Sequence, residues 1–371
     1  MIRLLLPLLS NSAKITWAIA VGCLMLAPEF CHAQLAGRAI AQPYFDHPNS
    51  ARFENCRPQP SMWQCDPEDD CQDYCGNSQA HRPSGWYGIA EFAPMLYDAR
   101  DDIPLMKQGA GVASPDRLHT ANLIKQFDPG GKFTIGRTLN CCYRVEGTYM
   151  GNYGWSNTLS VVDTGLSSAL DNFATANFTS GSESLATYLQ SGEINVRGWI
   201  DMPQGPFDVS LLLGGRYIHM NEDFVFNASS TVPAATFEAN TSTKNSMGGP
   251  QIGIDFQTMV HRSFYFDFDA KAALLFGNSS KSTTYTVAGG LGPGNITQAI
   301  DGSRTGFLVD LSLTGNYQMT RNVTIRGGYQ ALFLDGVALG KDNWQPTSPT
   351  PQLNTGGTIY HGPTLGVIWA R

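Results

Sequence analysis

Charged residues are scarce in this chain of 371 residues, where Asp, Glu, Lys and Arg together make up 15%. Acidic residues outnumber basic ones by 31 to 24, which gives a net charge of −7. A nucleic-acid-binding protein needs a basic surface against the phosphates, so we expect no nucleic-acid partner. Low charge with 39 glycines and 11% aromatic residues is typical of a β-rich envelope protein rather than a helical enzyme.

Long apolar runs are missing too. Beyond the N-terminal end, no segment reaches the ~18 consecutive apolar residues that favour a transmembrane helix. At that end, Arg3 and Lys14 precede an apolar stretch over residues 15–27, and Cys31 and Ala33 supply small residues at positions −3 and −1. This pattern predicts a secretory signal peptide at residues 1–33, cleaved after Ala33.

Catalytic and cofactor motifs are also absent from the sequence. It contains no Gly-x-Ser-x-Gly elbow, no Walker loop and no paired metal-ligand motif, so we expect no cofactor, no metal and no enzymatic activity. One alternative stays open. His219 is followed closely by Glu222 and Asp223, and a hydrolase at the rim of a barrel needs such a histidine beside a carboxylate. His361 is a second candidate of this kind.

The cysteines cluster near the start of the exported chain. Residues 34–84 are rich in Pro, Asn and Gln, show no sustained periodicity, and are interpreted as an irregular periplasmic segment. Because export leads into an oxidising compartment, disulfides are expected within this segment, in one of three possible pairings. The candidates are Cys56, Cys65, Cys71 and Cys75. The state of the adjacent Cys141 and Cys142 stays open.

Residues 263–275 show the clearest periodic pattern. Phe264, Phe266 and Phe268 fall on one parity, whereas Asp267 and Asp269 fall on the other. A period of two predicts a strand with one apolar and one polar face. The two like-charged aspartates should repel each other unless a cation lies between them.

Nine further stretches alternate in the same way, and long and short connections alternate between them. The strands are expected at residues 85–97, 130–139, 142–153, 189–201, 207–220, 247–259, 263–275, 304–319, 322–334 and 356–370. Five long outer loops and four short periplasmic turns would join ten antiparallel strands. This is the pattern of an all-β, up-and-down transmembrane β-barrel over residues 85–371, with the Cys-rich segment before it. A large soluble antiparallel protein is the alternative, since parity alone does not say which face meets water.

Mid-strand charges are expected to point into the lumen of this barrel. Ten strands enclose a narrow interior that side chains largely fill, so charges of both signs favour a neutralising network over an open pore. The predicted network consists of Arg144, Glu146, Arg197, Asp208, Arg216, Asp255, Asp267, Asp269, Lys271, Asp310 and Arg326.

Several segments resemble an outer-membrane β-barrel family typical of planctomycete bacteria. The likeness begins at about residue 85 and rests on Trp86-Tyr87 with Glu91-Phe92, and on the runs at 130–136, 143–149 and 360–367. The resemblance implies an outer-membrane location and no established activity. Such barrels commonly finish on a terminal aromatic residue. This chain departs from that pattern, because Ala370-Arg371 follows Trp369.

The sequence therefore predicts an outer-membrane protein with a structural or surface-interaction role. A small-solute porin and a rim enzyme are the alternatives. Expected partners are outer-membrane lipid, the barrel-assembly machinery and an extracellular ligand at the long loops. The sequence does not indicate the identity of that ligand or the oligomeric state.

Overall fold

The structure is a computed structural model. The chain divides into two compact units, Met1–Asp66 and Pro67–Arg371, and every described residue lies in the second. The described residues are 85–99, 102–109, 115–120, 123, 126–139, 143–168, 177–200, 207–231, 234–261, 263–289, 294–344 and 351–370. The predicted signal peptide, the Cys-rich segment and Cys141-Cys142 lie outside them.

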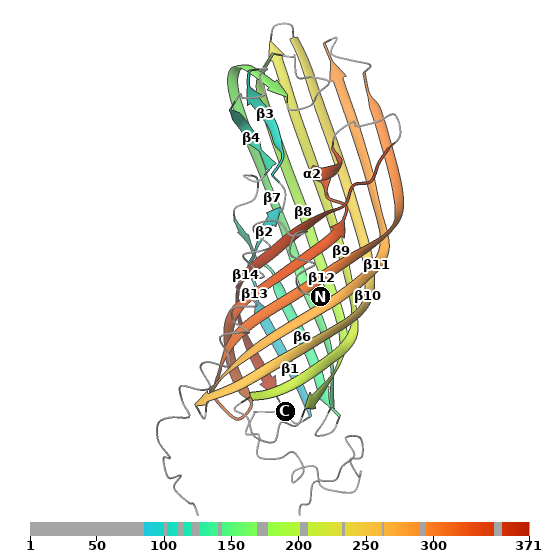
Figure 1. Ribbon diagram of the computed structural model, residues 1–371. Coiled ribbons are helices and arrows are strands. Elements are labelled where there is room, and N and C mark those ends of the chain that lie inside the picture. The colour runs from blue at the N-terminus through green and yellow to red at the C-terminus, as the bar shows by residue number, and fades with distance from the viewer. Residues whose placement is uncertain are drawn as a thin grey trace, which may run out of the picture. The chain divides into compact units, whose positions relative to one another are not determined.

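Ten strands form a closed antiparallel ring (Figure 1). They are β1 (Trp86–Phe92), β6 (Gly131–Thr138), β7 (Tyr143–Ser168), β8 (Phe178–Ile200), β9 (Phe207–Thr231), β10 (Ala234–His261), β11 (Phe264–Ala288), β12 (Ile296–Gln318), β13 (Val323–Val337) and β14 (Gly356–Ala370). The register between β1 and β14, from Tyr87↔Ala370 to Phe92↔Leu365, closes the ring. The predicted up-and-down β-barrel is confirmed.

Smaller elements occupy two of the outer connections. The connection from β1 to β6 carries β2 (Met95–Ala99), β3 (Pro104–Gln108), β4 (Asp116–His119) and β5 (Phe127–Asp128). Strand β2 pairs with β14 and β5, whereas β3 pairs with β4 and with the outer end of β7. The connection from β13 to β14 carries the single-turn helix α2 (Gly340–Asn343). No helix in the described ranges is long and apolar enough to cross a membrane.

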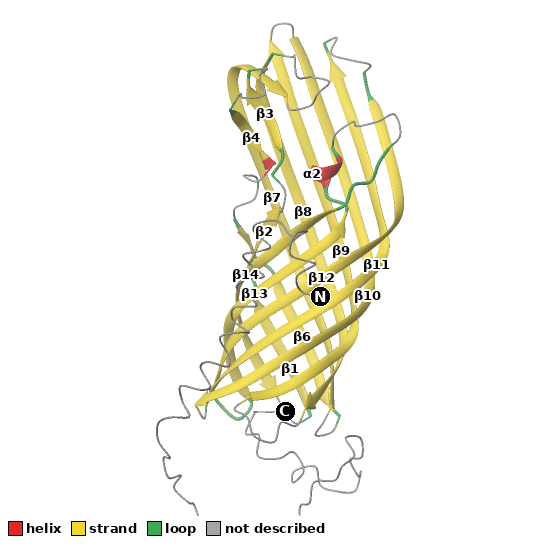
Figure 2. Ribbon diagram, viewed as in Figure 1, coloured by secondary structure: helices red, strands yellow, loops and turns green. Residues whose placement is uncertain are grey.

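Three of the five predicted outer loops, at residues 155–188, 221–246 and 277–303, are largely strand (Figure 2). Residues 221–246, expected as a loop, extend β9 and β10 in one continuous ladder up to the pair Ala234↔Thr231. Most of residues 155–188 and 277–303 likewise belong to strands. The short helix expected at residues 170–176 lies outside the described part of the chain.

The physical reason is that the apolar face changes sides along the long strands, as β9 shows. In the lower half of β9, Leu211 and Leu213 face outward and are 51% and 65% exposed. In the upper half, Phe224 and Phe226 face inward and are fully buried. The lower zone presents its apolar side chains to lipid, as a transmembrane barrel requires. The upper zone is built as a water-soluble sheet with its own core.

We call the outward apolar side chains of the lower zone the apolar belt. On β11 it includes Phe266 and Leu274, whereas Tyr265 and Lys271 of the same strand are buried in the lumen. Other large exposed members are Phe133, Ile135, Tyr149, Ile194, Val196, Tyr217, Ile252, Phe307, Leu313, Tyr317, Ile325, Leu365, Val367 and Trp369.

Candidate functional site: the barrel lumen

Arg197 on β8 is the centre of the lower lumen. Its Nη1 lies 2.9 Å from Asp255 Oδ2, and its Nη2 lies 3.1 Å from Asp269 Oδ2 and 3.4 Å from Glu146 Oε2. These carboxylates come from three other strands, so one guanidinium ties four strands together across the lumen. The side chain is only 5% exposed, and a charge so buried requires such partners.

Arg216 on β9 forms the next layer toward the outer end. Its Nη1 lies 2.9 Å from Asp310 Oδ2 and 3.3 Å from Glu193 Oε1, and its own side chain is fully buried. Lys271 joins the two layers because its Nζ is 3.2 Å from Glu193 and 3.8 Å from Asp269. Gln251 donates a hydrogen bond to Glu193, and Gln330 donates one of 2.7 Å to Asp310.

A third group lines the wall where the ring closes. Glu91 on β1 lies 3.3 Å from Arg326 and 3.9 Å from Lys132. Arg144 lies 2.5 Å from Glu146, and its guanidinium stacks 4.9 Å from the ring centre of Trp199. The stack screens this cation from water on one side.

The predicted network residues take three kinds of position. Nine form the ion pairs described above: Arg144, Glu146, Arg197, Arg216, Asp255, Asp269, Lys271, Asp310 and Arg326. Asp267 instead accepts a hydrogen bond of 3.0 Å from Asn316. Asp208 lies at the lower end of β9, opposite Gln257.

Three charged members of the lumen are absent from the predicted network. Glu193 and Lys132 stand on the polar parity of their strands, and Glu91 alternates with the exposed Phe92. The same alternation that selected Arg197 would have selected Glu193. Of the two aspartates expected to repel each other, Asp269 is the one that lies within ion-pair distance of Lys271 and Arg197.

A polar cavity of about 310 Å³ remains within the lower part of this network. It is lined by both signs of charge, including Arg144, Asp255 and Asp267, and by residues of the β12–β13 turn such as Arg321 and Asn322. Its position places it at the inner end of the barrel. Such a space suits ordered water or a small polar solute.

Above the network, aromatic side chains fill the lumen. Tyr153 and Trp155 of β7 stack with ring centres 5.0 Å apart, and Tyr360 of β14 lies 5.1 Å from Trp155. The indole of Trp155 donates a hydrogen bond to Met95 O, and the Tyr153 hydroxyl donates one to Ala93 O. The insertion between β1 and β6 is thereby fixed inside the outer half.

The segment around α2 closes the remaining space, and we call residues 338–344 the plug. Glu222 Oε1 accepts the amide hydrogen of Gly340 at 2.7 Å, and Asn245 bonds both the amide and the carbonyl of Ala338 at 2.9 Å. Trp344 is fully buried, with its ring centre 5.0 Å from that of Phe226. Wall residues thus hold the plug by main-chain hydrogen bonds and apolar packing.

Two buried carboxyl groups lie in this outer half, beyond the apolar belt. Burial raises the pKa of Glu222 to about 7, against the opposing effect of the Lys341 and Gly340 amides. Burial, and then the charge of Asp102, raises the pKa of Glu183 to about 8. Desolvation disfavours the charged form of both groups.

The two histidines considered for a rim enzyme face outward. His219 Nδ1 lies 2.9 Å from Ser246 Oγ, whereas Glu222 points into the lumen on the opposite face of β9. His361 lies 2.5 Å from the Tyr329 hydroxyl, also on the outer side. Glu222 therefore projects away from His219, because residues of opposite parity on a strand project to opposite faces, whereas Asp223 shares the parity of His219.

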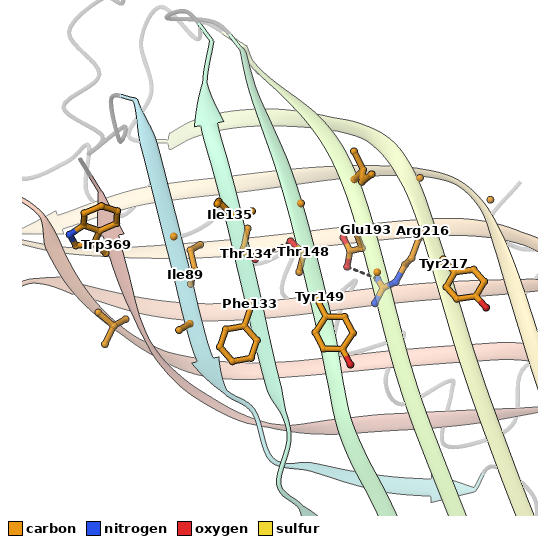
Figure 3. Close-up of a pocket in the computed structure, with 18 residues that line it drawn as sticks. Ile89, Phe133, Thr134, Ile135, Thr148, Tyr149, Glu193, Arg216, Tyr217 and Trp369 are labelled. Carbon is orange, nitrogen blue, oxygen red and sulfur yellow. Dashed lines mark hydrogen bonds and ion pairs between the residues drawn. The ribbon is translucent and has the colours of Figure 1, made fainter.

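A larger hollow of about 1030 Å³ lies on the lipid-facing side of β1 and β6–β10. Outward glycines leave it open, among them Gly88, Gly147 and Gly215. In Figure 3, Phe133 and Tyr149 project on the side of the wall opposite the Glu193–Arg216 ion pair. Residues of the apolar belt line most of this hollow, and Glu193 and Arg216 of the lumen also border it.

Comparisons with solved structures give low similarity throughout. The outer-membrane protease OmpT of Escherichia coli is 11% identical over 78% of this chain and 97% of its own, with a TM-score of 0.40. Ail, the attachment invasion locus protein of Yersinia pestis, is 9% identical over 77% and 98%, with a TM-score of 0.22. A Pseudomonas aeruginosa FadL homologue is 8% identical over 76% and 89%, with a TM-score of 0.21.

No curated protein sequence matches the chain. One family model does match, over residues 161–366, and it is described as "Putative beta barrel porin-7 (BBP7)". The match covers more than half of the chain and runs from the outer part of β7 to β14. With its ten-stranded ring and apolar belt, this chain belongs to the BBP7 family of outer-membrane β-barrel proteins.

Proposed function

We propose that this barrel is a closed outer-membrane protein with a structural or surface-interaction role. The observation that carries the proposal is the double closure of the lumen. In the membrane zone, Arg197 and Arg216 with their carboxylates cross the interior, and above them lie the stacked aromatic rings and the plug. An open pore would need a continuous aqueous path, and these side chains and the plug lie across the interior where it would run.

The outer extension supports a role at the cell surface. On β9, strand continues from Tyr217 at the edge of the belt to Thr231, which corresponds to roughly 45 Å along the strand at ~3.3 Å per residue. Its outward side chains are largely hydroxyl and amide groups such as Asn221, Asn227 and Ser229. So long an extension presents a broad polar sheet to the cell exterior.

Conductance in planar bilayers tests the proposal. The purified barrel should insert without producing stable ion steps. Regular steps from the intact protein would refute the closed-lumen role. A variant that lacks residues 338–353 is the control. Its refolding is followed by heat-dependent gel mobility, so that a folded, inserted barrel without the plug can be compared with the intact protein.

A small-solute porin is the second candidate, favoured by the family's description as a porin and by the polar cavity of about 310 Å³. In that case the plug would be the movable part, since the charged layers below it include a cavity that reaches the inner end. Solute uptake into liposomes tests this candidate. A disulfide between cysteines placed at positions 283 and 343 should block the uptake by fixing the plug. These positions are suitable because Thr283 already contacts Asn343.

The remaining expectations belong to the same proposal. We infer export by a signal peptide cleaved after Ala33, contact with outer-membrane lipid and with the assembly machinery, and an extracellular ligand at the outer end. We infer no catalytic role, and the resemblance to planctomycete barrels points to such a source. Mass spectrometry of the mature N-terminus tests the cleavage site: a first residue other than Gln34 would refute it.

A further inference from the structure

Asp267 is the one carboxylate of the lower cavity that takes part in no ion pair with the described part of the chain. The carboxylates that line this cavity are Glu91, Glu146, Asp255, Asp267 and Asp269. All of them except Asp267 lie within ion-pair distance of an arginine or a lysine. Asp267 accepts a hydrogen bond of 3.0 Å from the neutral side chain of Asn316. A carboxylate in a protein interior is costly unless a cation or a proton compensates its charge.

The cations of the lumen wall already have other partners. Their ion pairs join six carboxylates, Asp267 not among them, to six cations, which are Lys132, Arg144, Arg197, Arg216, Lys271 and Arg326. Arg321 also lines the cavity, but it is exposed in the β12–β13 turn, far along the chain from Thr314, which stands opposite Asp267. The paired network is thus balanced in charge without Asp267.

The side chains beside Asp267 on β10 add hydrogen-bond acceptors. Gln257 lies directly opposite Asp267 in the register, and Asp255 lies diagonally across, opposite Asp269. All of these residues line the cavity. A ligand that carries a positive charge and several N–H donors can therefore bond to the Asp267 carboxylate and to the amide carbonyl of Gln257 at the same place.

The cavity suits an organic cation better than a metal ion. Its volume of about 310 Å³ is more than ten times the ~15 Å³ that suffices for one water molecule. Ile89, Ile368 and the ring of Tyr265 contribute apolar surface to the lining. Among the described residues, no three His, Cys, Asp or Glu side chains are grouped so that they could hold a metal ion.

We propose that the lower cavity binds a small organic cation, a protonated primary amine, with Asp267 as its counter-ion. The ammonium group donates hydrogen bonds to Asp267 and to Gln257, and a short hydrocarbon part packs against Ile89, Ile368 and Tyr265. Hydrogen bonds from an ammonium to a carboxylate are roughly twice as strong as neutral ones, so this contact would dominate the affinity.

The ligand would enter from the inner end of the barrel, because the β12–β13 turn borders the cavity there. Binding does not require a path through the lumen. The assignment therefore goes beyond the proposed structural or surface-interaction role, and it does not depend on whether the lumen conducts.

Calorimetric titration of the full-length barrel in lipid nanodiscs tests the site. The probe is n-propylamine hydrochloride at about pH 7, and empty nanodiscs provide the blank. The amine should bind with one-to-one stoichiometry in the millimolar range or below, as expected for so small a ligand. The uncharged n-propanol, which has nearly the same shape, should not bind. Equal binding of n-propanol, or saturable binding of potassium chloride without binding of the amine, would overturn the proposal.

Asp267→Asn should weaken binding of the amine ten-fold or more, because it removes the charge that the ammonium contacts. Asp301→Asn is the matched control, since Asp301 is exposed on the outer part of β12 and should leave the affinity unchanged. Asp267→Asn breaks no ion pair of the described chain, so it should refold with the heat-dependent gel mobility of the native protein. An unchanged affinity in Asp267→Asn would overturn the proposal.

Gln257→Leu provides a second variant, which should weaken binding several-fold because it removes a neutral acceptor. It keeps the proposal testable if Asp267→Asn refolds poorly. The titrations of the native barrel with the amine, the alcohol and the potassium salt remain decisive in that case. Loss of affinity in Asp301→Asn equal to that in Asp267→Asn would show that the amine binds by general charge attraction, and would refute the site.

Discussion

Replacement of Arg197 by Met is the most direct test of what holds the lower lumen together. The methionine keeps much of the side-chain volume but removes the cation that contacts Glu146, Asp255 and Asp269. Glu146 keeps Arg144, and Asp269 keeps Lys271, at 2.5 and 3.8 Å. Asp255 therefore loses the only ion pair it has within the described chain, and one buried carboxylate is left without a cation.

The expected loss of unfolding free energy follows from this single uncompensated carboxylate. Removal of one partner from a buried ion pair costs about 3–5 kcal/mol, because the remaining charge stays desolvated. We expect the free energy of unfolding of Arg197→Met to fall by that amount. The double variant with Asp255→Asn should recover most of the loss, since it removes the uncompensated charge. The coupling between the two positions is then measured by the double-mutant cycle.

Urea-induced unfolding in lipid vesicles, followed by heat-dependent gel mobility, provides the assay. Arg304→Met is the matched control, because Arg304 is half-buried in the outer zone and, among the described residues, its hydrogen bonds go to main-chain oxygens of Ser303 and Leu353. It should change the free energy by less than about 1 kcal/mol. A loss below 1 kcal/mol in Arg197→Met, or no recovery with Asp255→Asn, would refute the role of Arg197 as the central tie of the network.

Three further changes probe the two zones and the plug. The raised pKa of Glu222 means that its carboxyl favours folding at low pH, and that this contribution is lost between about pH 4.5 and 7. The stability of Glu222→Gln relative to the native protein should therefore rise over this window by up to about 3 kcal/mol, and a pH-independent difference would contradict it. Leu213→Arg, in the belt, should cost about 2–4 kcal/mol of unfolding free energy, whereas Asn227→Arg, in the outer zone, should change it by less than about 0.5 kcal/mol; equal effects would show that the belt is misplaced. Trp155→Leu should loosen the insertion between β1 and β6 and speed proteolysis there by several-fold, and unchanged cleavage would count against its anchoring role.

Much of the barrel could be predicted from the sequence because a lipid-facing strand imposes a strict period of two. Residues 263–275 show this well: Phe266 lies in the belt and Lys271 in the lumen. The ten strands were therefore predictable in order and approximately in number. Their pairing register, such as Asp255↔Asp269, was not, because a single chain does not indicate how far neighbouring strands slide.

The lumen was predictable in its residues but not in its contacts. Alternation selects Arg197 and Arg216 as inward-facing, but only the ring shows that Arg216 meets Asp310, which is 94 residues away. The same limit applies to His219 and Glu222. They are neighbours in sequence, yet the strand continues through them and sends them to opposite faces.

By itself, the sequence determined that this protein is a β-barrel with alternating apolar and charged faces. Only the tertiary structure decided how far the barrel extends, because the apolar parity reverses near residue 218 on β9. Below that point Leu213 faces lipid, and above it Phe224 faces a packed interior. A periodicity that changes phase within one strand looks like a strand that ends and a polar loop that begins. The surrounding medium, lipid below and water above, is the physical reason for the change.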